Sequence, residues 1–227
     1  MSVPGSIANP RLDFRTNALG TLTLLEQARK SDIGRFVYTS SAAVYGAPKY
    51  VPIDEEHPTA PLSPYGISKL TGERYCLLNH SQYGVPTVSL RLFNVFGPGQ
   101  RDNQYAGVIK KFLTLAGRKQ APTIYGNGRQ TRDFVHVSDV VHALLLARKR
   151  KAAVGQVMNI GTGKETSINR LADVIARIAN LKKRPVHLPA REGDISRSVA
   201  KVERARRLLG FEARVSLEEG LREMLTS

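Results

Sequence analysis

"RFVYTSSAAV", residues 35–44, is the stretch from which the fold follows. Its apolar run has the length of a buried strand, and it ends in the small and hydroxyl-bearing residues of a turn. A second run of this kind, "VPTVSLRL", occupies residues 85–92. Apolar spacing predicts a helix over 10–30, before the first strand, and another from about 64 to 83, between the two strands. Strands that alternate with helices in this way predict an α/β fold with a parallel sheet.

The remainder of the chain continues this alternation. The proline-rich segment 46–62 is predicted to be a loop, and "FNVFGPGQ", residues 93–100, is interpreted as a break in regular structure because it holds two glycines and a proline. Further elements are predicted as a helix near 105–117, a short strand at "PTIYG" (122–126), a strand-to-helix unit at 133–149, a strand at 156–160, and helices at 167–180, 201–209 and 216–225.

Composition places the chain among globular proteins. It has 227 residues, of which 41% are hydrophobic and 23% charged. No apolar run approaches the eighteen residues or so of a membrane span, and the N-terminus has no secretion-signal pattern, so we expect no membrane association. The single cysteine, Cys76, rules out an internal disulfide framework and suits a reducing cytoplasm.

The positive charge is unusual and uneven. The chain holds 34 basic against 19 acidic residues, and residues 100–151 alone hold 11 basic and 3 acidic side chains. Such an excess favours polyanions such as nucleic acid, or small diphosphates. It is equally compatible with a solvated basic face, or with one half of a protein whose acidic half lies elsewhere.

The motif "SPYGISK", residues 63–69, places Tyr65 and Lys69 one helical turn apart on the same face. An ammonium beside a phenol favours the phenolate and lowers a pKa of about 10 toward neutrality, and a drop of about three units corresponds to roughly 4 kcal/mol. A Tyr-Lys pair of this spacing is by itself common on protein surfaces. Here, however, the predicted strand at 35–41 ends in Ser41, and ligands of doubly wound sheets bind at the carboxyl ends of strands. The serine hydroxyl and the phenol are therefore expected to face one crevice.

Six motifs in this order resemble the extended short-chain dehydrogenase/reductases, and most closely the NAD-dependent sugar-nucleotide epimerases of the UDP-glucose 4-epimerase type. They are "TSSAAVYG", "SPYGISK", "LRLFNVFGPG", "GNGRQTRDFVHVSDVV", "NIGTG" and "REGDISRS", and they cover essentially the whole chain. The resemblance implies that Ser41, Tyr65 and Lys69 are a catalytic triad and that Asn17 helps to order the cofactor site together with Tyr65 and Lys69. It also implies NAD as cofactor, with Tyr65 taking the proton of the sugar's 4-hydroxyl while the hydride at C4 passes to NAD.

The fold implied by this resemblance is the C-terminal part of a doubly wound, Rossmann-like parallel sheet with a small α/β substrate-binding lobe. Residues 1–95 and 130–161 are assigned to the incomplete NAD-binding domain, and residues 96–129 and 162–227 to the lobe. At the positions of Ala42 and Ala43, dehydratases of the family that this chain resembles carry Asp-Glu, and decarboxylating relatives carry a glutamate. Alanine can supply neither acid nor base, so the resemblance favours a simple epimerase.

Five residues match positions that hold the nucleotide sugar in the epimerases. Arginine forks suit a diphosphate, and a carboxylate can accept both ribose hydroxyls. The small side chain of Ser198 falls where relatives limit the sugar's 2-substituent, which suggests room for an N-acetyl group. The predicted substrate-binding residues, with Ser41 on the sugar's C4 oxygen, are Ser41, Asn94, Arg132, Arg191, Asp194 and Ser198.

A dinucleotide-binding glycine motif is missing from the sequence. Such a turn reads Gly-x-Gly-x-x-Gly or Gly-x-x-Gly-x-x-Gly after a first strand. The Gly-x-Gly triplets of this chain lack the third glycine; they are Gly97/Gly99, Gly126/Gly128 and Gly161/Gly163. We therefore expect that about 60–80 residues of the family pattern, roughly two βαβ units, lie outside this chain. We expect a longer gene product or a separate chain to supply this N-terminal half. Without it, the strand at 35–41 would be an open sheet edge. The 227 residues alone are then expected to be inactive.

The leading hypothesis is a nucleotide-sugar 4-epimerase that works as a homodimer. The alternative is a non-catalytic remnant of the family that binds a nucleotide sugar or a partner. A nucleic-acid binder rests on charge alone, without aromatic interleaving or a reading motif, and is not favoured. No metal is expected, because His136 and His142 lie six residues apart without a third ligand near them.

Overall fold

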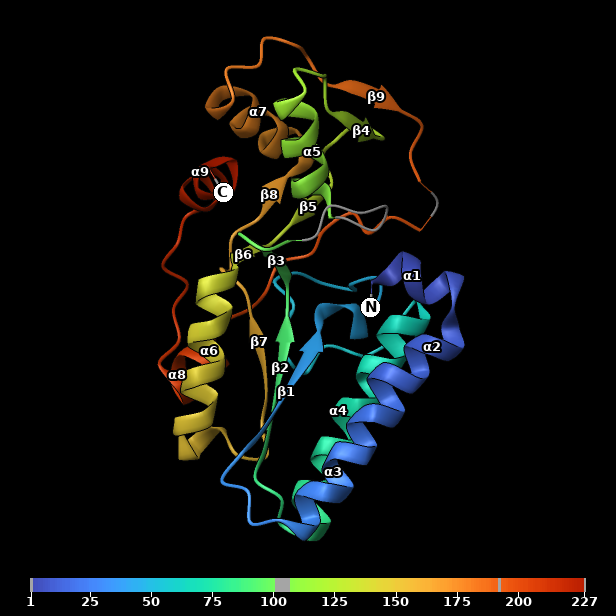
Figure 1. Ribbon diagram of the computed structural model, residues 1–227, viewed down its shortest axis with the longest axis vertical. Coiled ribbons are helices and arrows are strands. Elements are labelled where there is room, and N and C mark those ends of the chain that lie inside the picture. Colours follow the sequence, from blue (N-terminus) through green and yellow to red (C-terminus); the bar gives the residue numbers. More distant parts are fainter. Residues whose placement is uncertain (1, 101–106, 192, 227) are drawn as a thin grey trace.

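The computed structural model describes residues 2–100, 107–191 and 193–226. A three-stranded sheet lies between two layers of helices, and a smaller lobe of helices and short strands sits at one end of it (Figure 1). The α/β class predicted from the alternation of elements is confirmed.

The sheet has the order β1 (Phe36–Ser41), β2 (Thr87–Leu92), β7 (Val157–Ile160), and both pairings are parallel. In the register of β1 and β2, Ser41 lies opposite Leu92. The central strand β2 is buried along most of its length, as its continuous apolar pattern predicts for a strand covered on both faces. Among the described residues β1 pairs only with β2, so its other edge is open, as the sequence predicted.

One face of the sheet is covered by two long helical segments (Figure 1). The predicted helix at 10–30 is confirmed, but it contains one turn of π-helix; it consists of α2 (Pro10–Phe14), η1 (Arg15–Leu19) and α3 (Gly20–Lys30), preceded by the short α1 (Val3–Ala8). Beside it runs α4 (Pro64–Tyr83). Leu25, Tyr38 and Cys76 form a buried cluster where α3, β1 and α4 meet.

The bounds of α4 follow directly from its sequence. Ser63 caps the helix, since its Oγ accepts a hydrogen bond from the Gly66 backbone N–H at 3.1 Å, and Pro64 occupies the first helical position. At the other end Gly84 adopts the left-handed conformation, with φ of 70°, which terminates the helix. The predicted helix over 64–83 is confirmed, and its capping by Ser63 places Tyr65 in the first turn of the helix.

The opposite face of the sheet is covered by α6 (Val137–Lys149) and α8 (Glu203–Leu209). Small residues of α6 let it approach the sheet closely, because Ala143 and Ala147 pack in the same buried cluster as Leu90 and Met158. This cluster is the larger part of the core around the sheet.

The lobe has its own core, in which Phe96, Phe112, Leu171 and Leu221 are buried together. Its helices are α5 (Val108–Gly117), α7 (Ile168–Ile178) and α9 (Leu217–Thr226), and its strand pairs are β4 (Thr123–Tyr125) with β9 (Val186–Leu188) and β5 (Thr131–Arg132) with β8 (Thr166–Ser167). Between sheet and lobe, β3 (Asn94–Phe96) pairs with β6 (Phe134–His136).

Several short elements differ from the prediction. The interpretation of residues 93–100 as a break is wrong at its start, because β3 occupies Asn94–Phe96. β5, β8 and β9 were also missed, since strands of two or three residues show too little alternation to be recognised. Of the predicted helix near 105–117, residues 105 and 106 lie outside the described residues. The short turns η2 (Ala42–Val44) and η3 (Lys151–Ala153) complete the elements.

In the described ranges of the chain, no helix combines the length and the apolar character that crossing a membrane requires.

Candidate active site

Ser41 and Tyr65 meet at the carboxyl end of β1. The strand ends at Ser41, the chain turns through η2, and the first turn of α4 packs against this turn. Gly66 permits the close approach, because a Cβ at this position would lie 2.7 Å from the carbonyl oxygen of Ala43. Ser41 Oγ accepts a hydrogen bond from the Ala43 backbone N–H at 3.2 Å, and the Ser41 side chain lies near enough to Tyr65 to influence its phenol. The two hydroxyls that the sequence predicted to share a crevice therefore lie together.

Lys69 lies one turn farther along α4, with its amine turned toward the strand. Its Nζ donates a hydrogen bond to the carbonyl oxygen of Thr39 at 2.9 Å. The same nitrogen lies 5.9 Å from the centre of the Tyr65 ring and 5.2 Å from that of Tyr38. The ammonium thus lies between the end of β1 and the aromatic rings of Tyr65 and Tyr38.

The electrostatics of this pair differ from the sequence prediction. Burial raises the pKa of the Tyr65 phenol, and the hydrogen bond with Ser41 opposes this rise only in part. Burial also lowers the pKa of the Lys69 ammonium. Lys69 does not by itself bring the phenol toward neutrality, because desolvation disfavours both charged forms and the amine is directed at Thr39. Burial thus opposes the lowering of the Tyr65 pKa that the Tyr-Lys spacing predicts, and that lowering stays a prediction.

Asn17 belongs to the π-helical turn η1, which packs against α4. Its Nδ2 donates to Oδ1 of Asp13 at 2.8 Å, and its backbone carbonyl oxygen accepts a hydrogen bond from the Thr21 hydroxyl at 2.6 Å. Single π-helical turns inside α-helices occur frequently at functional sites. Asp13 was not identified from the sequence, since a lone carboxylate in a helical stretch gives no signal of burial.

A buried ionic network fixes α4 to the sheet. Arg91 of β2 and Glu73 of α4 form a two-point ion pair, with Nη2 to Oε1 at 2.6 Å and Nε to Oε2 at 3.0 Å. The Ser40 hydroxyl donates to Oε2 of Glu73 at 2.7 Å, and Nη1 of Arg91 donates to the Tyr45 hydroxyl at 2.8 Å. Because Ser40 precedes Ser41 and Glu73 lies one turn beyond Lys69, this network sets the distance between the strand end and the helix that carries the tyrosine.

A cavity in the lobe brings together four of the predicted substrate-binding residues. It has a volume of about 310 Å³ and is lined by Asn94, Arg132, Arg191 and Asp194. An adjoining cavity of about 390 Å³ shares Arg191 and Asp194 with it. Asn94 reaches the cavity from the start of β3, so the strand that the sequence missed is one of the elements that position the cavity wall.

Charged side chains are fixed along the cavity wall. Nη2 of Arg132 lies 2.6 Å from Oδ1 of Asp194, and Nη1 of Arg132 donates to the Ile195 carbonyl oxygen at 2.6 Å. The guanidinium carbon of Arg191 lies 3.6 Å from the centre of the Tyr125 ring. Tyr125 was missed as a site residue, although the predicted strand "PTIYG" carries it.

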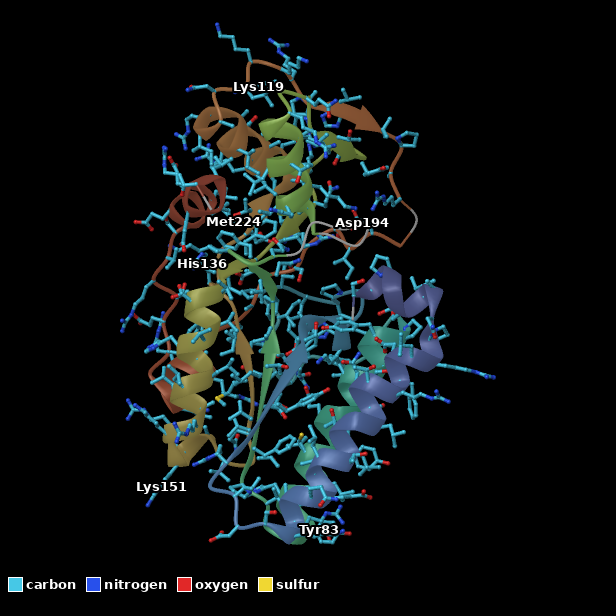
Figure 2. The ribbon with its side chains drawn as sticks, viewed as in Figure 1. Tyr83, Lys119, His136, Lys151, Asp194 and Met224 are labelled. Atoms are coloured by element: carbon cyan, nitrogen blue, oxygen red, sulfur yellow. The ribbon has the colours of Figure 1, made fainter. Side chains whose placement is uncertain are left out.

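Ser198 and the triad do not line this cavity. Ser198 is buried, and neither it nor Ser41, Tyr65 or Lys69 is among the described lining residues. Figure 2 shows Asp194 on the side of the lobe that faces α1 and the sheet. The wall of the cavity that Asp194 forms therefore lies on the side of the lobe that faces the sheet.

A second buried carboxylate connects sheet and lobe. Asp133, which follows β5, accepts hydrogen bonds from the backbone N–H groups of Thr162, Gly163 and Ala200 and from the Thr162 hydroxyl, at 2.7–3.1 Å. A Cβ at Gly161 would lie 2.6 Å from Oδ2 of Asp133, so the glycines of "NIGTG" allow this loop to approach the carboxylate.

The described part of the basic segment, residues 107–151, does not place all its charges on one surface. Lys119 and Lys151, both within it, lie at opposite ends of the molecule in Figure 2. Part of its charge serves the cavity through Arg132. The arrangement fits a solvated surface with a local anion site better than a continuous track for nucleic acid.

Comparison with known proteins gives consistent results. Residues 1–161 match the NAD dependent epimerase/dehydratase family. The chain is 42% identical over 226 residues to a putative UDP-glucose 4-epimerase of Methanocaldococcus jannaschii, and the match covers 99% of this chain and 73% of the relative.

Two solved structures are similar over nearly the whole chain. UDP-glucose 4-epimerase of Thermotoga maritima with UDP-glucose has a TM-score of 0.95 and 38% identity, covering 99% of this chain and 73% of that one. UDP-N-acetylglucosamine 4-epimerase of Methanobrevibacter ruminantium, in complex with UDP-N-acetylmuramic acid, has a TM-score of 0.95 and 35% identity, covering 99% and 72%.

Proposed function

Because the chain belongs to the NAD dependent epimerase/dehydratase family, we propose that it is an NAD-dependent nucleotide-sugar 4-epimerase with Ser41, Tyr65 and Lys69 as its catalytic residues. The observation that carries the proposal is the position of Tyr65 in the first turn of α4, packed on the turn that follows Ser41, with the amine of Lys69 5.9 Å from the centre of its ring. Its relatives and structural neighbours named above are 4-epimerases of UDP-sugars.

Each residue of the triad has a distinct role in this reaction. NAD⁺, held next to Lys69 and Asn17, would supply the acceptor and later the donor of the hydride at the sugar's C4. Tyr65 takes the proton of the 4-hydroxyl and gives it back, and Ser41 donates a hydrogen bond to the C4 oxygen. Lys69 holds its ammonium beside the phenol, which favours the phenolate against the effect of burial.

The residues present fit the nicotinamide end of NAD. Lys69 uses one N–H on the Thr39 carbonyl oxygen, so two donors are left for the hydroxyls of the cofactor's ribose. Asn17 lies on the neighbouring helix and supports the same end. The sequence has no glycine-rich turn for the pyrophosphate, so we assign no pyrophosphate contact to this chain.

The lobe cavity is the proposed site of the nucleotide diphosphate. Asn94, Arg132 and Arg191 supply amide and guanidinium donors for phosphate oxygens, and Asp194 can accept from ribose hydroxyls. UDP-glucose and UDP-galactose are the proposed substrate pair, and the small Ser198 leaves N-acetylated sugars within the range. The division into residues 1–95 with 130–161 for the cofactor, and 96–129 with 162–227 for the lobe, is proposed with Asn94 and Arg132 of the first part reaching the nucleotide site.

Turnover of UDP-glucose tests the function. With NAD bound, the protein should produce UDP-galactose from UDP-glucose, detected by chromatography of the nucleotide sugars. Arg191→Lys should raise KM about tenfold with kcat nearly unchanged, because it removes the guanidinium plane stacked on Tyr125 and costs about 1.4 kcal/mol of substrate binding. Arg177→Lys, on the exposed side of α7, is the matched control and should leave KM unchanged. An unchanged KM in Arg191→Lys would remove this residue from the proposed site.

We further propose two protein contacts. Exposed apolar side chains on α3 and α4, among them Leu24, Ile67 and Leu78, suit packing against a second copy of the chain as a homodimer. The open edge of β1 suits a segment or separate chain that supplies the dinucleotide half. Ile67→Glu combined with Leu78→Glu should convert dimers to monomers in sedimentation velocity, and a dimer that persists would refute the helix interface.

A further inference from the structure

Residues 193–199, which include the proposed nucleotide contact Asp194, belong to no helix or strand. Individual contacts therefore fix their course. On the side of the cavity, Arg132 of β5 pairs with Asp194 through Nη2 and donates to the Ile195 carbonyl oxygen through Nη1, both at 2.6 Å. The arginine that is proposed to bind phosphate thus also holds the neighbouring segment.

Glu165 holds the same segment at a second point. Its Oε1 and Oε2 accept hydrogen bonds from Nε and Nη2 of Arg197 at 2.9 Å and 2.8 Å. Oε1 also accepts one from the hydroxyl of Thr131 on β5 at 2.9 Å. The backbone N–H of Thr131 in turn donates to the carbonyl oxygen of Ser196 at 2.9 Å. Glu165 therefore joins β5 to the segment through its own set of hydrogen bonds.

The geometry of this contact sets it apart from an isolated surface ion pair. Exposed pairs usually stabilise a protein little, and the Arg197 side chain is 57% exposed. Here, however, a carboxylate meets a guanidinium at two points and takes a third hydrogen bond from Thr131, and exposed pairs contribute most in such networks. The pKa of Glu165 is held below its usual value, first of all by the hydrogen bond with Arg197, so the carboxylate is charged at neutral pH.

The local path of the chain is already fastened without this ion pair. Asp133 anchors the loop that leads to Glu165 and also the far end of the segment, because it accepts hydrogen bonds from the backbone N–H groups of Gly163 and Ala200 at 2.9 Å and 3.1 Å. The additional ion pair acts on the part of the segment that lies nearer to Asp194.

A bound nucleotide would compete for Arg132. Among the described contacts, its guanidinium uses two N–H groups on backbone carbonyl oxygens and one on Asp194, so two of the five can donate to phosphate oxygens. The negative charge of a diphosphate weakens the hold of Arg132 on the carboxylate of Asp194 and repels that carboxylate. A second anchor that does not use Arg132 is then needed to keep Asp194 at the cavity.

We infer that Glu165 is a positioning residue of the nucleotide site: by holding Arg197, it keeps the segment 193–199 on β5 while phosphate engages Arg132. The inference rests on the proposed nucleotide site in the lobe. Glu165 is not among the described residues that line either cavity, so it acts through the segment that it fixes. Asp194 then stays in place to accept hydrogen bonds from ribose hydroxyls.

The test is the binding of UDP-glucose, measured by isothermal titration calorimetry, which needs neither NAD nor turnover. Glu165→Gln keeps the length of the side chain and removes its charge. We expect its Kd for UDP-glucose to rise about fivefold, the effect of losing a well-formed exposed ion pair. In turnover, KM should rise by the same factor while kcat stays within about twofold, because the triad is untouched. Glu212→Gln, which breaks the exposed pair of Glu212 with Arg206 at 3.0 Å, is the matched control and should leave Kd unchanged.

A double-variant cycle separates the ion pair from independent effects of its two residues. Arg197→Gln breaks the same contact from the other side and should raise Kd equally. The double variant Glu165→Gln/Arg197→Gln should bind no more weakly than either single variant, because each already removes the contact. The exchanged pair, Glu165→Arg with Arg197→Glu, should recover much of the affinity, since the Thr131 hydroxyl can accept a hydrogen bond as well as donate one.

The inference is overturned by equal or tighter binding in Glu165→Gln. Tighter binding would mean that Arg197, once released, contacts the nucleotide itself. Additive losses in the double variant also overturn it, and so does a lower thermal midpoint with an unchanged Kd, which shows a purely structural role. A wild-type protein that does not bind UDP-glucose rejects the nucleotide site and the inference together. A wild type that binds it without turnover rejects only the proposed epimerisation, and the comparison of Kd values still decides the role of Glu165.

Discussion

Replacing Tyr65 with phenylalanine is expected to reduce kcat for epimerisation by about a thousandfold, because positioned acid-base groups contribute roughly 10²–10⁴ to rates. The other phenol near Lys69, that of Tyr38, is buried and donates its hydrogen bond to the Lys69 carbonyl oxygen, so it does not replace Tyr65. Binding of UDP-glucose, measured by isothermal titration calorimetry, should change little, since Tyr65 does not line the nucleotide cavity. Turnover is measured as UDP-galactose formed by the NAD-bound protein.

The control for this substitution is Tyr83→Phe. Tyr83 lies at the far end of the same helix, exposed to solvent with the Arg29 guanidinium over its ring (Figure 2). Loss of its hydroxyl should leave kcat unchanged.

The same pair of variants separates the enzyme from the alternative, a non-catalytic nucleotide-sugar-binding remnant. A remnant would bind UDP-glucose and show no turnover in any variant, and a Tyr65→Phe protein with wild-type kcat would refute the proposed chemistry.

Replacing Glu73 with glutamine is expected to lower the free energy of unfolding by about 3–5 kcal/mol, the usual effect of removing one partner of a buried ion pair. Arg91 would remain buried, with its side chain 5% exposed and without its counter-charge. The glutamine can still accept a hydrogen bond but does not balance the guanidinium. Urea unfolding followed by circular dichroism measures the change.

Glu218→Gln is the matched control, because Glu218 pairs with Arg177 and Arg222 on an exposed surface of the lobe. Exposed ion pairs contribute about 0–1 kcal/mol to the free energy of unfolding, so the urea midpoint of Glu218→Gln should hardly change. The double replacement of Glu73 by leucine and Arg91 by methionine should recover much of the stability lost in Glu73→Gln, since no charge is then left in the interior. If Glu73→Gln proves as mild as Glu218→Gln, the network does not hold α4 on the sheet as described.

Much of the fold could be predicted because its signals are local. The alternation of strands and helices gave the class, and Ser63, Pro64 and Gly84 marked both ends of α4. The strands β5, β8 and β9 could not be predicted, because a strand of two or three residues is too short to show a periodic pattern. The motifs also indicated the family, and that is the family the chain matches.

The sequence by itself determined that Tyr65 and Lys69 share a helical face and that Ser41 ends a neighbouring strand, because spacing within an element and the order of elements are properties of the chain. Only the tertiary structure decided what surrounds them. The pairing of Glu73 with Arg91, the stacking of Arg191 on Tyr125 and the burial of Asp13 join residues from different elements or depend on what packs over them. The rise in the pKa of the Tyr65 phenol also belongs to the tertiary structure, because it comes from burial, and burial exists only once the chain has packed.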